Sequence, residues 1–405
     1  MKIIAMKSVC VDFYAVGQGL FSSGVINLLN NKFVWVYDCG TSSKKSILQK
    51  EINYFKTTNN QCKHIDLLTL SHFDKDHISG LEEILKDFTI GILMLPYANL
   101  SQRLILALQY NIKVNSKYFD FFVNPIYFLK KKNLIKSIEK ILFVSHSNNI
   151  SEVEEFSRDS LLEEKKTSFK TIDEHDLSPE QLFDKKSFDS ESKIEFLSPA
   201  TSINVFNGWE FVPYNDIEFS PKNRTSFINE IEKIKIFIKK DYNKFINHLK
   251  KLYSCEFGKS SFQKNIISLF LFIGQTSNYI DNVCIQEKSN DYVNCFKLLN
   301  TQDKLTILYS GDGFLNSQVR LQKLINFYHK NRLINLFLFQ VMHHGSKNNW
   351  HPGLAKKIAP KKSIFSSDPK NRSYKHPHAD VVKDFLCFHP IQVDKSKRYS
   401  LNFIF

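Results

Sequence analysis

The feature that most constrains the fold is the run Ser-His-Phe-Asp-Lys-Asp-His at residues 71–77. It follows an apolar segment, residues 65–70, that predicts a buried strand, and it precedes residues 81–88, which predict a helix. Two histidines and two aspartates between apolar elements would repel one another or stay unsatisfied without a counter-charge. A pair of metal ions would supply that charge. The predicted ligands are His72, Asp74, Asp76 and His77.

The neighbouring segments predict an α/β fold. Residues 24–29 and 33–37 are strand-like and lie on either side of Asn30 and Asn31, which indicates a hairpin. Residues 90–95 predict a further strand. Strands that alternate with helices are typical of α/β layer architectures, which place their sites at the carboxyl ends of strands.

Two segments depart from this alternation, and we predict that they are insertions into a single domain spanning residues 1–405. The first covers approximately residues 101–190 and the second approximately residues 205–258. Between positions 227 and 252, apolar residues recur in steps of three, four or seven, which predicts one long amphipathic helix. Its other face is rich in lysine. This face is either an ordinary solvated surface or one that binds along a phosphate backbone.

Two further polar clusters each follow a predicted strand. Asp312 lies in Ser-Gly-Asp-Gly after residues 305–309, where flanking glycines would let its carboxylate approach a metal closely. His343 and His344 lie in Met-His-His-Gly-Ser after residues 336–341. Either cluster is a weak signal alone. Three clusters that all end strands predict ligands that meet at one rim of the fold.

The order of these motifs resembles the metallo-β-lactamase superfamily, and most closely the hydrolase domain of ComEC-type competence proteins. The shared order is His-x-Asp-x-Asp-His after a strand, then Gly-Asp, then His-His-Gly-Ser. Four more segments agree: Val-Gly-Gln-Gly at 16–19, Tyr-Asp-Cys-Gly at 37–40, Asn-Ile-Ile-Ser-Leu at 265–269 and Tyr-Lys-His-Pro-His at 374–378. The resemblance implies a four-layer αβ/βα sandwich with helical insertions and a metal site on one edge, between the sheets.

The resemblance also implies a role for each predicted ligand. His72 and Asp74 would hold one metal, and Asp76 and His77 would hold the other. Asp312 would bridge the two ions. Asp76 would count among the catalytic residues, because its loss should abolish activity.

Other residues receive roles from the same resemblance. His343 directly follows its strand and is favoured as the last ligand, which leaves His344 to contact the phosphate, although the choice between them stays open. Asp38 would orient a ligand histidine. His376 would donate a proton to the leaving oxygen, or else be an ordinary surface histidine. The candidates for substrate binding are Ser346, His378 and Asn265.

Two departures from the superfamily pattern bear on the metal. Asp74 replaces the second histidine of the common His-x-His-x-Asp-His motif. The third motif has no convincing histidine, since His146 follows a strand at the wrong place in the order. A site with more carboxylate and less imidazole favours Mn²⁺, with Zn²⁺ as the alternative and Mg²⁺ also compatible.

Composition adds a class of partner and a location. A net charge of +14 over 405 residues favours a polyanion such as nucleic acid, although a generally lysine-rich composition would give the same charge. The longest apolar run, residues 266–273, is too short to cross a membrane. The seven cysteines are scattered without metal or redox spacing, which favours reduced thiols in the cytoplasm and no membrane partner.

These observations together predict a metal-dependent phosphodiesterase, a nuclease directed at DNA. Two ions lower the pKa of a shared water and neutralise the charge of an in-line displacement at phosphorus. A stand-alone nuclease of this kind fits defence against foreign DNA, switched on by a sensor protein. The sequence does not decide between DNA and RNA or between single- and double-stranded substrates. It also leaves open whether cleavage is internal or from an end.

Two other functions also stay open. A phosphodiesterase of the same fold that acts on a small molecule or a nucleotide would need a closed pocket, which residues 227–252 could roof. Salt would separate the two enzymes, because nucleic-acid binding weakens steeply as salt rises. A non-catalytic, metal-binding interaction subunit would keep the ligands without the activity.

Overall fold

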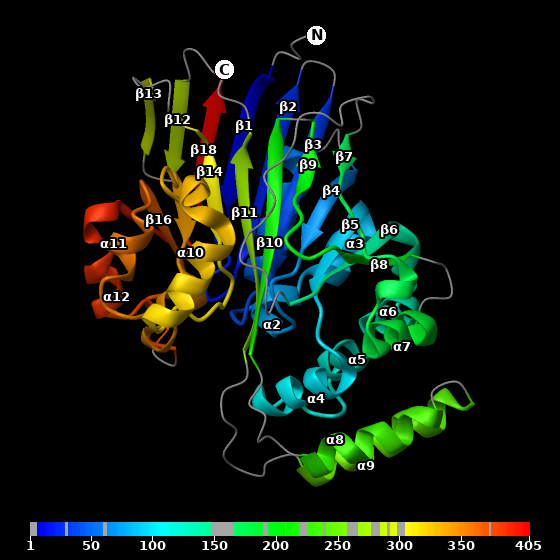
Figure 1. The fold of residues 1–405 in the computed structure, drawn as a ribbon. Helices are drawn as coiled ribbons and strands as arrows, with labels where there is room; N and C mark the ends of the chain where they lie inside the picture. Colours follow the sequence, from blue (N-terminus) through cyan, green and yellow to red (C-terminus); the bar gives the residue numbers. More distant parts are fainter. Residues whose placement is uncertain are drawn as a thin grey trace.

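The computed structural model describes most of the chain, with gaps. The described residues are 6–28, 31–59, 63–146, 166–188, 193–206, 208–218, 225–237, 240–256, 266–276, 284–289, 292–297, 304–371 and 374–405. Within them the chain is a mixed α/β structure with two large mixed sheets, as the sequence predicts (Figure 1).

The first sheet has parallel strands on one side and antiparallel strands on the other. Its strands, in spatial order, are β13 (Tyr292–Lys297), β12 (Cys284–Ser289), β18 (Tyr399–Ile404), β1 (Met6–Phe13), β2 (Phe21–Leu28), β3 (Lys32–Cys39), β4 (His64–Thr69), β5 (Thr89–Pro96), β6 (Ile138–Val144) and β8 (Ile194–Leu197). β2 and β3 pair antiparallel, which confirms the predicted hairpin. From β3 to β8 every neighbouring pair is parallel, so the carboxyl ends of these strands share one edge.

The second sheet repeats this division. Its strands, in spatial order, are β17 (Pro390–Val393), β16 (Lys362–Ser366), β15 (Leu338–Gln340), β14 (Thr306–Tyr309), β11 (Ile266–Gln275), β10 (Trp209–Glu218), β9 (Ile203–Val205) and β7 (Thr167–Ser168). β14 to β17 are parallel, whereas β9, β10 and β11 run antiparallel to their neighbours.

Three apolar clusters show how the layers pack. The first lies between the sheets, where Trp35 of β3 and Phe211 of β10 meet edge to face with ring centroids 5.6 Å apart. The second lies between the first sheet and helices α1 (Lys45–Thr58), α3 (Leu81–Asp87), α4 (Leu100–Gln109), α5 (Lys117–Val123), α6 (Pro125–Lys131), α8 (Thr225–Ile234) and α9 (Tyr242–Glu256). The third packs the second sheet against α10 (Gln318–Leu333), α11 (Leu354–Ile358) and α12 (Ala379–Asp384). The remaining helices are α2 (Lys75–Ile78) and α7 (Pro179–Phe188).

Each range expected as an insertion contains a strand of a sheet. Residues 101–190 include β6, which pairs with β5 and β8 in the first sheet. Residues 205–258 include β10, which pairs with β11 over its whole length. The parts that leave the sheets are therefore mainly the helices α4 to α7 and the pair α8 and α9.

The single long helix predicted for residues 227–252 is wrong. α8 ends at Ile234, a short 3₁₀ turn follows at Lys235–Phe237, and α9 begins at Tyr242. The apolar spacing fits both helices because their buried faces, with Phe227 in α8 and Phe245 in α9, join the same core cluster. Lysines on the outer face pair locally; Lys233 contacts Glu230, which favours ordinary solvation of that face.

No helix among the described residues is long and apolar enough to span a membrane.

Candidate metal centre

The predicted ligand loop lies between β4 and α2. Leu70 continues the strand by donating its backbone N–H to the Met94 carbonyl. The backbone then turns at Ser71, whose N–H donates to Asp38 Oδ1 at 2.7 Å. Asp74 occupies the N-cap of α2 with extended backbone angles, and His77 lies within that helix. Both histidines of the loop are fully buried, so their rings are fixed by packing as well as by hydrogen bonds.

The second sheet brings its residues to the same edge through unusual backbone geometry. Gly311 has a φ of +51°, and a Cβ there would lie 2.6 Å from Ser71 Cβ, so only glycine permits this close approach. His343 and His344 both have left-handed φ values, 46° and 58°. Such strain in non-glycine residues is uncommon and clusters at functional sites.

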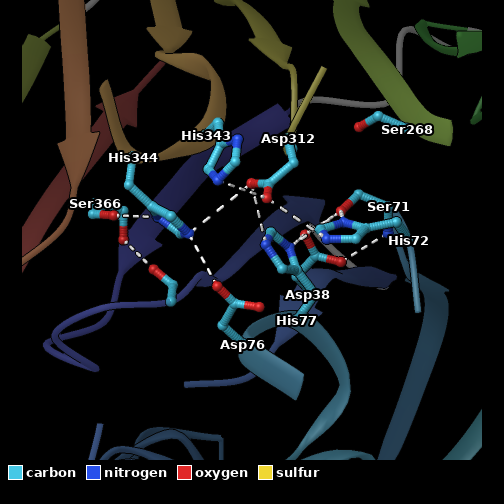
Figure 2. A network of polar contacts seen from close by, with 12 residues as sticks. Asp38, Ser71, His72, Asp76, His77, Ser268, Asp312, His343, His344 and Ser366 are labelled. Atoms are coloured by element: carbon cyan, nitrogen blue, oxygen red, sulfur yellow. Dashed lines mark hydrogen bonds and ion pairs between the residues drawn. The ribbon is translucent and has the colours of Figure 1, made fainter. Parts of the chain in front are cut away.

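Four histidine Nε2 atoms converge on the carboxylate of Asp312 (Figure 2). Oδ1 of Asp312 lies 3.2 Å from Nε2 of His77 and 3.8 Å from Nε2 of His344. Oδ2 lies 3.6 Å from Nε2 of His72 and 3.5 Å from Nε2 of His343. The carboxylate therefore lies between two pairs of imidazoles, and each pair takes one residue from each sheet.

The opposite nitrogen of each ring is held by an acceptor. His77 Nδ1 lies 2.7 Å from Asp38 Oδ2, and His344 Nδ1 lies 2.6 Å from the Ser366 carbonyl oxygen. Because a carboxylate and a carbonyl only accept, each Nδ1 carries the proton. Each Nε2 is then the nitrogen that faces Asp312.

The other two rings follow the same pattern. His343 Nδ1 lies 2.9 Å from Asn349 Oδ1, and the Asn349 Nδ2 donates to the Asp312 carbonyl, which fixes the orientation of the amide. His72 Nδ1 lies 3.1 Å from Ser71 Oγ, whose own proton goes to Asp38 at 2.6 Å. All four histidines thus present Nε2 to one carboxylate.

Several of the converging atoms lack a normal hydrogen bond. Among the described residues, Nε2 of His72, Nε2 of His77 and Oδ1 of Asp312 are buried and form no well-aligned hydrogen bond, although the last two atoms are 3.2 Å apart as an ion-pair contact. Leaving buried polar atoms unpaired costs about 1–3 kcal/mol each. Three convergent atoms of this kind fit a cation between them.

The carboxylates of the site also need a counter-charge. Burial, and the nearby Asp76 and Asp312, raise the pKa of Asp74 well above its usual value. Burial raises the pKa of Asp312, but His343, His77 and His72 more than offset it and hold that pKa well below its usual value. The pKa values of two neighbouring buried carboxyls are thus pushed in opposite directions, as expected where negative charges and imidazoles are crowded together.

Two triads of ligand atoms are close enough to share an ion. The ligand atoms of His72, Asp76 and His77 lie within 4.8 Å of one another, and so do those of His77, Asp312 and His344. Asp76 Oδ2 also lies 3.2 Å from His344 Nε2. The sequence favoured His343 as the metal ligand and His344 as the contact to the phosphate. In the structure the Nε2 atoms of both residues face Asp312, so both are placed as candidate ligands.

The remaining candidates lie at or beyond the edge of this cluster. The ring of His376 is 5.6 Å from that of His343, and its buried Nδ1 has no hydrogen-bond partner among the described residues. Burial, with His343 and His344 nearby, lowers the pKa of His376 to about 4. The ring is therefore neutral at pH 7, when a proton donor would need to be protonated.

Three other sequence candidates have separate surroundings, and a fourth lies outside the described residues. Ser346 Oγ accepts the backbone N–H of Asn348, and His378 caps α12 by accepting the N–H of Asp380. His146 Nδ1 bonds the carbonyl of Asn215 and belongs to neither triad. Asn265 lies outside the described residues.

Sequence reasoning missed several residues that build the site. Asn349 and the Ser366 carbonyl orient His343 and His344, and neither carries a motif signal of its own. Tyr110, directly after α4, lies beside His72 with ring centroids 6.3 Å apart. Burial, and then Asp74, Asp312 and Asp76, raise the pKa of this phenol well above its usual value, so it keeps its proton.

Comparison with known proteins does not extend the sequence resemblance. No model of a protein family matches the chain, and no curated protein sequence matches it. The class of protein therefore rests on the fold and on the geometry of the site.

Proposed function

We propose that this chain is a two-metal phosphodiesterase of the metallo-β-lactamase fold, with DNA as its substrate. The observation that carries the proposal is the convergence of four Nε2 atoms on Asp312, each ring held by its Nδ1. A structural histidine normally satisfies both nitrogens inside the protein. Four that leave the same nitrogen facing one carboxylate support a metal centre.

The proposed fold rests on the layer order and the position of the site. Two mixed sheets share a core, and helices cover both outer faces, which fits an αβ/βα sandwich. The site residues lie at the carboxyl ends of β3, β4, β14 and β15, within or just after the strands.

The donor set fits two ions on either side of the Asp312 carboxylate. His77, His344 and Asp76 would hold the ion on the Oδ1 side. His72 and His343 would hold the ion on the Oδ2 side. The predicted ligand Asp74 belongs to neither of the two triads of converging ligand atoms. When bound, such ions lower the pKa of a shared water and stabilise the charge of an in-line phosphoryl displacement.

The chain's own residues prepare the site for an anionic ester. Asp38 lies behind both loop histidines: it accepts from His77 and from Ser71, which in turn supports His72. His376 stands at the outer side of His343, where a neutral imidazole can accept or relay a proton from a bound ligand. The mix of carboxylate and imidazole favours Mn²⁺, with Zn²⁺ as the alternative.

The choice of DNA rests on charge and on the openness of the proposed site. The net charge of +14 suits a polyanion, and His343 remains 36 % exposed beside Asp312, so one edge of the proposed centre is open to solvent. A role in defence against foreign DNA under a sensor protein is compatible with this chemistry and stays part of the proposal.

A digestion experiment tests the function. Purified protein is stripped with a chelator, then supplied with Mn²⁺, Zn²⁺ or Mg²⁺ and incubated with circular DNA, linear DNA, RNA and a chromogenic phosphodiester. We expect metal-dependent cleavage of DNA that weakens as salt is raised. Cleavage of the chromogenic ester alone, insensitive to salt, would favour a small-molecule phosphodiesterase; no hydrolysis with any metal would overturn the proposal.

A further inference from the structure

The helical segment after β5 supplies a side chain to the centre. Tyr110 directly follows α4, and its ring lies 6.3 Å from the ring of His72, at an interplanar angle of 49°. This ring contact puts Tyr110 on the His72 side of the Asp312 carboxylate. Burial, and then Asp74, Asp312 and Asp76, raise the pKa of the phenol well above its usual value. Among the described residues, the hydroxyl forms no hydrogen bond.

The position of Tyr110 is fixed by the helices around it. α4 is anchored by Arg103, a buried guanidinium that donates to the carbonyls of Ala98, Phe122 and Val123. The Tyr110 ring lies 6.2 Å from the Phe122 ring. These contacts fix both ends of the segment that carries the phenol.

The pair α8 and α9 adds a second support. The buried Tyr253 of α9 donates its hydroxyl to the Ile112 carbonyl at 2.6 Å, two residues after Tyr110. Its ring also packs on Phe119 of α5, with centroids 4.6 Å apart. The two helical segments that depart from the sheets thus meet at the turn that follows α4, and their contacts fix the position of this turn beside the centre.

The location of the phenol matters because the centre is asymmetric. On the Oδ1 side of Asp312 lie His77 and His344, and Asp76 contacts His344 at 3.2 Å while its ligand atom also lies within 4.8 Å of that of His72. On the Oδ2 side lie His72 and His343, and Tyr110 stands beside His72. A protonated phenol is a hydrogen-bond donor, and a donor beside a phosphate site strengthens anion binding.

We propose that the Tyr110 hydroxyl donates a hydrogen bond to a non-bridging oxygen of the substrate phosphate on the His72 side of Asp312. This inference rests on the proposed function and makes Tyr110 a substrate-binding residue. It also gives the helical segments a role: they position a donor that the sheets do not supply. The ligand is a phosphate group that is held by one neutral donor in addition to the metal ions.

The test compares Tyr110→Phe with Tyr127→Phe, a matched change on α6 where the ring packs on Tyr242 away from the centre. Both variants are loaded with Mn²⁺, their metal content is measured, and binding of inorganic phosphate is followed by calorimetry. We expect both to keep the metal content of the wild type, and only Tyr110→Phe to bind phosphate about 10- to 100-fold more weakly, as for a hydrogen bond to a charged group. The ratio kcat/KM on DNA should fall by a similar factor.

Other outcomes have definite meanings. Equal phosphate binding by Tyr110→Phe and wild type would overturn the inference, as would a wild type that binds no phosphate. Loss of metal from Tyr110→Phe would also overturn it, because the phenol would then serve the ions and not the phosphate. Phosphate binding that depends on Tyr110 without any hydrolysis of DNA or of the chromogenic ester would leave the inference standing and reject the proposed function.

Discussion

Strand β4 carries a histidine and aspartate group at each end, and the two groups differ in how their charges are satisfied. At its amino end, His64 and Asp66 line a cavity of about 360 Å³ together with Lys140 and Lys166. There Asp66 is paired with Lys166 and accepts the N–H of Val34, and His64 Nδ1 contacts Thr89. At the carboxyl end, the ligand atoms converge on one another, and among the described residues no lysine or arginine forms an ion pair with them.

The difference separates a structural charge cluster from a candidate centre. A cavity alone does not mark the site, because the cavity at the amino end is lined by groups that neutralise one another. At the carboxyl end, buried Nε2 atoms of His72 and His77 lack hydrogen bonds, although every Nδ1 is held. Unpaired atoms that point at one place indicate a candidate ligand site more strongly than the volume of a pocket does.

The largest effect on metal binding and activity is expected at Asp312, in the candidate metal centre. Asp312→Asn removes the charge that lies between the four Nε2 atoms, so we expect loss of bound metal and a fall in activity of more than about 100-fold, beyond the effect of losing an orienting partner. Metal analysis and DNA cleavage measure the two losses. Asp66→Asn, the matched change at the other end of β4, should keep both; loss of metal in Asp66→Asn instead would reverse the roles of the two ends.

A smaller effect on metal affinity is expected at Asp38, which contacts the ligand His77 and is not itself a proposed ligand. Asp38→Asn keeps the shape of the side chain, and asparagine tolerates the positive φ of 55° at this position. The amide is a weaker acceptor for His77, so metal affinity should fall about 10- to 100-fold. A chelator competition titration measures the change, and unaltered affinity would show that Asp38 does not orient a ligand.

The pH dependence of metal affinity gives a further test of the candidate metal centre. Burial lowers the pKa of His77, but Asp312 and Asp38 more than offset it, and the pKa lies well above its usual value. A metal ion must displace this proton, so affinity should rise with pH, by up to about tenfold per unit for each proton released.

The same proton stabilises the metal-free fold. Because the folded-state pKa is raised, this stabilisation is fully present below about pH 6.5 and is lost as the pH rises through the folded-state pKa. Mn²⁺ should therefore raise Tm more at about pH 8 than at about pH 6, where the proton opposes it. Thermal denaturation with Mn²⁺ and with chelator measures the difference, and an equal gain at both values would contradict a protonated His77.

The smallest effect is expected at the amino end of β4. Lys166 is 44 % exposed, so its pair with Asp66 should contribute less than about 1 kcal/mol to the free energy of unfolding. Lys166→Ala should lower stability within that limit and leave DNA cleavage unchanged. Chemical denaturation and the cleavage assay check both, and a large loss of cleavage would mean that this cavity takes part in function.

The parts of the fold and site that could be predicted are those with a local signal. The ligand loop at residues 71–77 and the β2–β3 hairpin were readable because apolar strands end there in turn residues or in polar clusters. β10 was missed because Pro213, Asn215 and Asp216 read as non-strand. The strand tolerates Pro213 because β9 pairs only with residues 209–211, so that side has no ladder to interrupt.

The rest depends on contacts between distant residues. Both His343 and His344 face Asp312, and both have left-handed backbone angles, a conformation that the sequence of this segment does not indicate. The roles of Asn349 and Tyr110 depend on chain segments that meet only after folding. The periodicity of apolar residues and the amino-acid composition do not indicate which distant segments come into contact.

The most direct test of the metal centre is anomalous diffraction from crystals of the protein soaked in Mn²⁺. The account predicts two anomalous peaks on either side of the Asp312 carboxylate, one beside His77 and His344 and the other beside His72 and His343. No peak at Asp312, or a peak only in the cavity at the His64 end of β4, would contradict it.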